Sequence, residues 1–464
     1  MKLDSDPVGE LIRRLALPAS IGMVFSTLLA VTDTWYAGMM SPTALAALSL
    51  AGPLYFLVIT LGIGIGQATN ALVGNALGGE RRNEARRFAV QAMGFSFLVS
   101  VVASIAAFIW TPAIFRLMGG ESPYLEPAMV YMRVVLAGTL LFALSLVFNA
   151  ILNTRGDTHS YRNAQIGAAI ANAGLDPLFM FVLDLGVAGV AVATLCVQAG
   201  AAAYLFLRVR QLDFLDDFSR RELIPDWHCH REIFGQSLPN TVSMMLVAIG
   251  SIIIVRYVAL FGESAMAAYG VALRIEQLML LPVIGINIAC LSLTGVNHGA
   301  GLHSRVSAIW HGGIAHAVVL MAAGGCLLLI FGGVVMRLFS SDADVQAIGT
   351  TYLHYEAFIL PAYGLIFVSG SVLQGLKRPE LAMYFNIVRQ IIGQLLLFWL
   401  AISVFETGIA GIWLSALIIN WIMAAVIVWF VRSRFLGSVH NERAPAVATE
   451  NTSGSHDSTR QGEF

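Results

Sequence analysis

The segment FAVQAMGFSFLVSVVASIAAFIWTP, residues 88–112, has no charged side chain, and as one helix it would cross a bilayer core of ~30 Å. Similar apolar runs recur along the whole chain of 464 residues, of which 57% are hydrophobic and 12% charged. A soluble protein of this size carries about 25% charged residues, so most of the surface is expected to face lipid. The sequence predicts an all-α polytopic membrane protein with twelve transmembrane helices, near residues 16–38, 51–78, 88–112, 124–154, 160–184, 187–208, 236–260, 267–297, 306–335, 346–376, 380–404 and 408–432.

Basic residues are concentrated in alternate loops. They crowd the loops after the second, fourth, sixth, tenth and twelfth helices, whereas the loops after the odd-numbered helices hold only Arg116 and Arg337. Because basic loops remain in the cytoplasm, both termini are predicted to be cytoplasmic, in the inner membrane of a bacterium. The predicted parts are a cytoplasmic N-terminus (1–14), an N-lobe (15–208), a cytoplasmic linker (209–235), a C-lobe (236–432) and a disordered cytoplasmic tail (433–464).

The two predicted lobes repeat each other at a shift of 221 to 222 residues. Leu17-Pro18 recurs as Leu238-Pro239, and Gly186-Val187-Ala188-Gly189 recurs as Gly408-Ile409-Ala410-Gly411. Six helices per lobe is an even number, so both lobes insert the same way up, as two pseudo-symmetric halves. Transporters often place their pathway between such halves. The sequence shows no catalytic triad and no nucleotide-binding loop, which favours a transporter over an enzyme.

Polar side chains recur at one depth of the predicted N-lobe. Counted at about 1.5 Å per residue, Asp33 lies ~9 Å, Thr194 ~10 Å and Asp176 ~12 Å from the periplasmic end of its helix. Asn172 lies one turn from Asp176 on the same helical face. A charged group inside the bilayer costs at least a few kcal/mol, so two carboxylates at one depth indicate a function.

Pro177 adds a further oxygen to this set. Proline has no N–H, so the carbonyl of Ala173 is expected to lose its helical partner and to stay free near Asp176. A cluster of hard oxygen atoms suits a proton or a small cation, so Asp33, Asn172, Asp176 and Thr194 would be metal ligands only if sodium binds. No other cofactor is indicated.

The repeat provides an internal control for this prediction. If the polar residues were required by the scaffold, both lobes would carry them. The second lobe instead has apolar or uncharged residues at the positions of Asp33, Asn172, Asp176 and Thr194, namely Ile254, Gln394, Phe398 and Ala416.

The predicted C-lobe has charged residues of its own. Arg274 and Glu276 lie early in its second helix, Glu356 lies in its fourth and Arg389 in its fifth. Two interpretations are open: the opposite charges pair and neutralise each other, or they form a functional cluster.

The chain resembles the MATE (multidrug and toxic compound extrusion) family, most closely its DinF-like branch. The similarity spans residues 10–432. The residues that carry it are Leu17-Pro18-Ala19, Val31-Thr32-Asp33-Thr34, Asn153-Thr154-Arg155-Gly156-Asp157-Thr158, Asn172 to Asp176, Gly186-Val187-Ala188-Gly189, Ala193-Thr194 and Gly295-Val296-Asn297-His298-Gly299-Ala300-Gly301.

The resemblance implies a V-shaped pair of lobes that exports amphipathic, often cationic compounds against an inward proton or sodium gradient. The positions that match the family's N-lobe cation site are Asp33, Asn172, Asp176 and Thr194, and those that match its wider polar network are Tyr131 and Asn149. The expected partners are small amphipathic molecules and the lipid bilayer, with the protein a monomer. A net charge of −1 gives no nucleic-acid footprint.

Two alternatives remain. A lipid or lipid-linked oligosaccharide flippase of the same superfamily would usually have a more cationic central cavity. A polytopic membrane enzyme would need catalytic residues clustered near one interface, and the sequence shows none.

Truncation after Arg434 is predicted to leave insertion and transport unchanged, because nothing in the polar tail can bury a core. Membrane yield and efflux of the truncated chain are the measurements. Loss of either one would assign a role to the tail.

Overall fold

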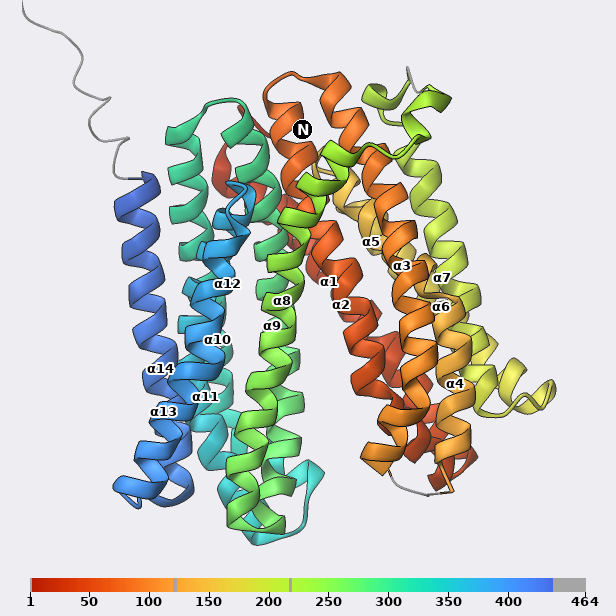
Figure 1. Ribbon diagram of the computed structural model, residues 1–464. Helices are drawn as coiled ribbons and strands as arrows, with labels where there is room; N and C mark the ends of the chain where they lie inside the picture. The colour runs from red at the N-terminus through yellow and green to blue at the C-terminus, as the bar shows by residue number, and fades with distance from the viewer. Residues whose placement is uncertain (1, 120–122, 217–218, 437–464) are drawn as a thin grey trace, which may run out of the picture.

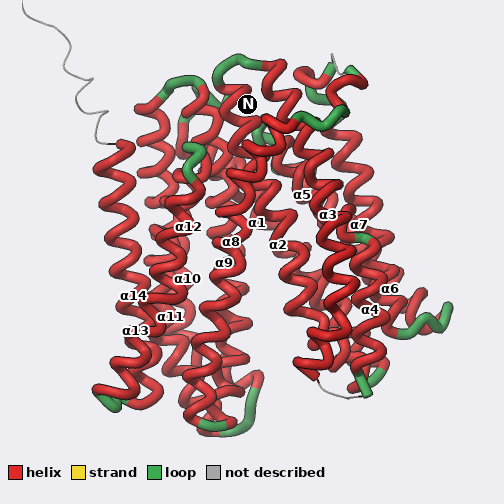
Figure 2. The backbone as a smooth tube through the Cα atoms, in the orientation of Figure 1, coloured by secondary structure: helices red, strands yellow, loops and turns green. Residues whose placement is uncertain are grey.

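The computed structural model describes residues 2–119, 123–216 and 219–436, and within these ranges it contains helices and no strands. Figure 2 shows that most loops lie at the two ends of the helical bundles. The helices of the N-lobe are α1 (Val8–Met40), α2 (Pro42–Gly78), α3 (Arg82–Gly119), α4 (Leu125–Ala137), α5 (Thr139–Asn153), α6 (His159–Pro177) and α7 (Val187–Val209). Those of the C-lobe are α8 (Trp227–Val258), α9 (Glu263–Gly299), α10 (His303–Phe339), α11 (Ala343–Gly375), α12 (Pro379–Ile387), α13 (Gln394–Trp399) and α14 (Gly408–Val431).

Short π-helical turns extend several of these helices. They are η1 (Leu178–Val182) after α6, η5 (Val388–Gly393) between α12 and α13, η6 (Leu400–Val404) after α13 and η7 (Arg432–Leu436) after α14. Eleven of the described segments are long and apolar enough to span a membrane, and the bent pair α4–α5 makes a twelfth. The predicted all-α fold with twelve transmembrane segments is confirmed.

The fourth predicted helix, 124–154, is wrong as a single element. It breaks at Gly138 into α4 and α5, which meet at a bend of 46°. The N–H of Gly138 bonds to the carbonyl of Val135 at 2.9 Å, three residues back, so the chain tightens there. The Leu195 side chain of α7 fills the space where a Cβ on residue 138 would lie, which suits a glycine.

In each lobe the first helix begins earlier than predicted. α1 begins at Val8, inside the segment expected to be a polar N-terminus (1–14). α8 begins at Trp227 and shortens the expected linker (209–235), because the Asp226 carboxylate caps it by accepting from the His228 N–H at 2.9 Å. The tail from residue 437 onward lies outside the described residues.

Figure 1 shows two helical bundles, α1–α7 and α8–α14, whose ribbons approach each other at the end that holds the N-terminus. The loops that sequence analysis found rich in arginine and lysine lie at this end, which we call the basic face. The lobes pack through α1 and α2 against α8 and α9, and α1 contacts α9 as well as α6. α1, a helix of the N-lobe, therefore packs against both lobes.

The segment that precedes each lobe docks on the other lobe. Leu3, ahead of α1, is buried in the C-lobe core, and the side-chain amide of Asn297 donates to its carbonyl at 3.0 Å. Ile224, ahead of α8, has its carbonyl held by the Gln91 amide of α3 at 2.8 Å. These crossed segments bind the lobes together at the basic face.

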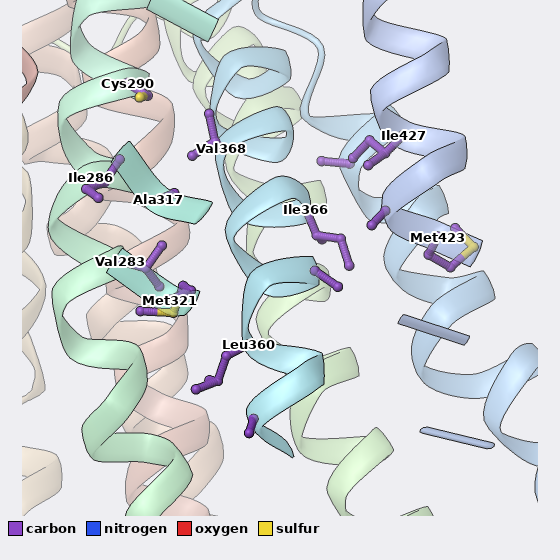
Figure 3. Packing of buried hydrophobic residues seen from close by; sticks show 14 of the residues in the cluster. Val283, Ile286, Cys290, Ala317, Met321, Leu360, Ile366, Val368, Met423 and Ile427 are labelled. Carbon is purple, nitrogen blue, oxygen red and sulfur yellow. The ribbon is translucent and has the colours of Figure 1, made fainter. Parts of the chain in front are cut away.

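Within each lobe, small residues let the helices approach closely. Figure 3 shows buried apolar side chains of the C-lobe, including Val283 of α9, Met321 of α10, Leu360 of α11 and Met423 of α14. A Cβ on Gly325 of α10 would collide with the α11 backbone at Ala357. Close packing of this kind holds helices together where lipid removes the hydrophobic driving force between them.

Candidate functional site

Three helices of the N-lobe bring the four predicted site residues into one cluster. α1 carries Asp33, α6 carries Asn172 and Asp176, and α7 carries Thr194. The hydroxyl of Thr194 donates to Asp33 Oδ2 at 3.0 Å, and the amide of Asn172 donates to Asp33 Oδ1 at 2.6 Å. The depths counted from the sequence therefore placed these residues correctly relative to one another.

The Asn172 amide is the link between the two carboxylates. Its nitrogen also donates to Asp176 Oδ2 at 2.8 Å, so both of its N–H groups are used. Two acceptor atoms remain buried without a donor among the described residues, Asn172 Oδ1 and Asp176 Oδ1. The cluster thus has more acceptors than donors, and these two oxygen atoms have no donor.

No basic side chain compensates the two carboxylates. Asp33 is 6% exposed and Asp176 is fully buried, and none of the ion pairs in the described ranges includes either residue. Two unpaired negative charges are very expensive in a low-dielectric interior, and the nearness of each disfavours ionisation of the other. The two carboxylates therefore cannot both be charged unless a proton or a cation lies beside them.

The Ala173 carbonyl is not free, contrary to prediction. Pro177 does remove its helical partner, but the hydroxyl of Tyr36 on α1 donates to this oxygen at 3.0 Å. Tyr36 lies three residues after Asp33, on the same side of α1. α1 is therefore joined to α6 through both Asp33 and Tyr36, and the second of these bonds needs no carboxylate.

A cavity of about 250 Å³ opens beside the cluster. Of the four site residues only Asp33 lines it, and the other three, which are buried, do not. The polar and aromatic side chains around the cavity are those of Ser26, Asp33, Thr34, Tyr55, Tyr131, Phe142, Ser145, Tyr161, Gln165 and Gln198. No lysine, arginine or histidine is among its lining residues, which all belong to described segments.

Of the two residues of the predicted wider polar network, one lies at the cavity and the other does not. Tyr131 is buried and lines the cavity with Asp33. Asn149, on α5, is buried but neither lines the cavity nor shares a hydrogen bond with the four site residues in the described structure. The structure therefore separates Asn149 from this site.

Sequence reasoning missed the polar side chains that α6 contributes to the cavity. Tyr161 and Gln165 lie one turn apart and are joined by a hydrogen bond of 3.1 Å from the Gln165 amide to the tyrosine hydroxyl. With Asn172 and Asp176 they form a polar stripe at helical spacing, and from Ala164 to Leu175 the other residues of α6 are apolar. This stripe is the sequence signal from which Tyr161 and Gln165 could have been predicted.

The predicted C-lobe cluster comes together only in part. The hydroxyl of Tyr352 donates to Glu276 Oε2 at 2.6 Å, and the Arg389 guanidinium lies over the Tyr363 ring, 5.6 Å from its centroid. Glu356 is 1% exposed with its Oε1 lacking a described partner, whereas Arg274 is exposed.

Direct pairing, one of the two interpretations of these charges, is wrong for the described residues. None of the four takes part in an ion pair within 4.0 Å. Tyr363 stands between two of them instead, since its hydroxyl contacts Glu276 at 3.4 Å while its ring faces Arg389.

This C-lobe cluster occupies the repeat-related position of the N-lobe cavity. At shifts of 221 to 222 residues, the cavity residues Tyr55, Tyr131, Phe142 and Gln198 correspond to Glu276, Tyr352, Tyr363 and Asn420. Asn420 accepts from Arg389 at 3.0 Å. The two lobes thus carry different chemistry at one architectural position.

Two repeated lobes of transmembrane helices, with a buried acidic site next to a cavity, define a polytopic membrane transporter. The chain belongs to the MatE family, whose model matches residues 18–178 and again 239–399. Each match falls on one lobe, and the two are displaced by the shift of the internal repeat.

Similar proteins span nearly the whole chain. A protein of Shewanella oneidensis named FAD transporter is 25% identical over 430 residues, which cover 90% of this chain and 93% of that protein. A probable multidrug resistance protein NorM of Thermotoga maritima is 22% identical over 414 residues, 88% of each chain.

Solved structures agree with the fold. One described as the outward-facing conformation of a multidrug resistance MATE family transporter is 25% identical with a TM-score of 0.88, covering 94% of this chain and 97% of that one. A MOP superfamily transporter from Pyrococcus furiosus, described as having a binding pocket of reverse polarity, is 26% identical with a TM-score of 0.87, covering 93% and 97%.

Asp33→Asn and Asp176→Asn are each expected to reduce active efflux to background while leaving the fold intact, because a neutral amide is cheaper than a carboxylate in this interior. The measurements are efflux from cells and the thermal unfolding midpoint of the purified variants. Asp184→Asn, the same change in an exposed turn eight residues beyond Asp176, is the matched control and should pump normally. Normal pumping by either site variant would rule out the pair as the coupling site.

Proposed function

We propose that this protein is a secondary active antiporter that exports amphipathic or cationic compounds in exchange for protons by alternating access. It would act as a monomer in the bacterial inner membrane, with both termini and the basic face in the cytoplasm. The observation that carries the proposal is the carboxylate pair: Asp33 and Asp176 share one amide donor, have no described cationic partner, and reach the cavity through Asp33 alone.

Asp33 is the natural point of competition between a proton and a substrate. Its side chain belongs both to the buried pair and to the cavity wall. A bound cation would favour the charged carboxylate, and a proton would remove that charge. One site can then exchange the two, provided that the two lobe conformations differ in their affinity for them.

The cavity wall favours positively charged aromatic compounds. Tyr55, Tyr131 and Tyr161 offer flat faces for stacking and for cation–π contacts, and Asp33 offers the only negative charge among the lining residues. One relative is named FAD transporter, so an anionic dinucleotide such as FAD is an alternative substrate. A wall without a basic residue does not favour it, nor does it favour a lipid-linked pyrophosphate.

The hydrogen-bond pattern favours a proton over sodium as the coupling ion. A sodium ion needs several free oxygen ligands, but the Ala173 carbonyl is engaged by Tyr36 and both oxygens of Asp33 already accept hydrogen bonds. Among the four site residues, only Asn172 Oδ1 and Asp176 Oδ1 are buried without a hydrogen-bond partner in the described structure. A single proton held by the carboxylate pair supplies the donor that this arrangement lacks.

Proteoliposomes that hold the purified protein should export ethidium, a planar cation, when an inward proton gradient (lower pH outside) is imposed without sodium. A sodium gradient alone should give no transport, and Asp33→Asn liposomes should stay at the leak rate under both conditions. Ethidium fluorescence follows the transport. If no transport occurs under the pH gradient and transport begins once an inward sodium gradient is added, the coupling ion is sodium and not the proton.

A further inference from the structure

Four glycines mark the helix crossings where the two lobes meet, in the halves of α2 and α9 that lie toward the basic face. Gly64 and Gly78 lie on α2 of the N-lobe, and Gly285 and Gly299 lie on α9 of the C-lobe. The repeat relates them in pairs, since a shift of 221 residues carries Gly64 onto Gly285 and Gly78 onto Gly299. We call these four residues the glycine closure.

The outer pair brings α2 and α9 into direct backbone contact. A Cβ on Gly78 would lie 2.8 Å from the carbonyl carbon of Val296 and still closer to its oxygen. A Cβ on Gly299 would lie 2.7 Å from Cα of Asn75 and closer still to that residue's oxygen. Val296 and Asn75 are themselves related by the same shift, so the contact is reciprocal.

The inner pair repeats this arrangement against the first helix of the opposite lobe. A Cβ on Gly64 would lie 2.9 Å from the Ser237 carbonyl of α8 and would overlap the hydroxyl of Thr241. A Cβ on Gly285 would overlap the Ala16 carbonyl and the hydroxyl of Ser20, both of α1. The contacted residues correspond as well, Ala16 to Ser237 and Ser20 to Thr241.

The contacts of the outer pair cannot be relieved by rotating a side chain, because all of the opposing atoms belong to the backbone. At Gly64 and Gly285 a side-chain hydroxyl is nearest, and backbone atoms at 2.9 Å or less lie behind it. Two of the opposing residues are also fixed across the lobes. The Asn75 amide donates to the Gly375 carbonyl of α11 at 2.9 Å, and the Ser20 hydroxyl donates to the Pro282 carbonyl of α9 at 3.0 Å. An added methyl group would therefore push the lobes apart at the basic face.

None of the four contacts supports the interior of one lobe, because each joins a helix of one lobe to a helix of the other. Alternating access requires that these crossings separate when the basic face opens. A methyl group at these positions thus opposes one conformation and leaves the other unaffected.

We propose that the glycine closure sets the balance between the two transport conformations: the form with a closed basic face depends on the absence of side chains at Gly64, Gly78, Gly285 and Gly299. The proposal rests on the alternating-access function above. Alanine at any of the four shifts the population toward the form that is open at the basic face.

The test measures the opening of the opposite face by electron paramagnetic resonance distances. Spin labels are placed at Leu117→Cys on α3 and Leu338→Cys on α10, exposed and repeat-related positions near the ends of these helices away from the basic face. The exposed native cysteines are replaced by Cys196→Ser and Cys326→Ser. The labelled protein is studied in lipid nanodiscs without substrate or gradient.

Gly64→Ala and Gly285→Ala are expected to lower the ratio of long to short distances by roughly tenfold, the effect of a typical overpacked contact. Gly94→Ala on α3 and Gly270→Ala on α9 are matched controls, because a Cβ at either position meets no atom within 4 Å. Their distance distributions should match the parent protein. Unchanged distances in Gly64→Ala and Gly285→Ala, or equal shifts in the controls, would overturn the proposal.

A rescue variant separates a conformational shift from misfolding. Thr241→Ala removes the hydroxyl that a Cβ on residue 64 would meet first and leaves the nearest atom at 2.9 Å. Gly64→Ala/Thr241→Ala should therefore return toward the parent distances, also where Gly64→Ala alone folds poorly. Failure of this return would contradict the steric origin. The distances need no transport, so a failed transport assay leaves this result standing, and unchanged distances leave the antiport proposal standing.

Discussion

Two carboxylates that share one amide donor inside the N-lobe constrain much of the surrounding structure. Asp33 and Asp176 cannot both be charged there without a proton or a cation, because no described basic side chain lies beside them. Their helices are held in place by neutral groups instead: the Thr194 hydroxyl, the Asn172 amide and the Tyr36 hydroxyl. Protonation can therefore alter the contact between α1 and α6 without destroying it.

α1 provides the physical route from this site to the other lobe. Its far half carries Asp33 against α6, and its first half packs on α9, where Ser20 bonds to Pro282. The chain ahead of it is fixed to the C-lobe by Asn297 and Arg305, which donate to the carbonyls of Leu3 and Asp6. A change of charge at Asp33 thus acts on a helix whose other end is anchored in the opposite lobe.

The sequence was sufficient for the fold because hydrophobic length, loop charge and the internal repeat are all local in the chain. The four site residues could be predicted to lie together because helical rise converts residue number into depth. What could not be predicted depended on contacts between helices. Tyr36 reaches the Ala173 carbonyl only through the packing of α1 on α6, and the break at Gly138 accompanies the position of Leu195. Asn149 and Arg274 have suitable chemistry, but Asn149 lies near the end of α5 at the basic face, whereas Asp33 lies near the opposite end of α1, and the Arg274 side chain is exposed.

Competition between proton and substrate at Asp33 is most directly tested by proton release from the purified protein. When a cationic substrate such as ethidium is added in weakly buffered detergent solution, a pH indicator should report protons released upon binding. The substrate Kd should fall as the pH rises, because a bound proton lowers the affinity for the substrate by the same factor as bound substrate lowers the affinity for the proton. Asp33→Asn should release none and bind independently of pH. Binding by the unmodified protein without proton release, with a Kd that is constant across pH, would contradict a shared site.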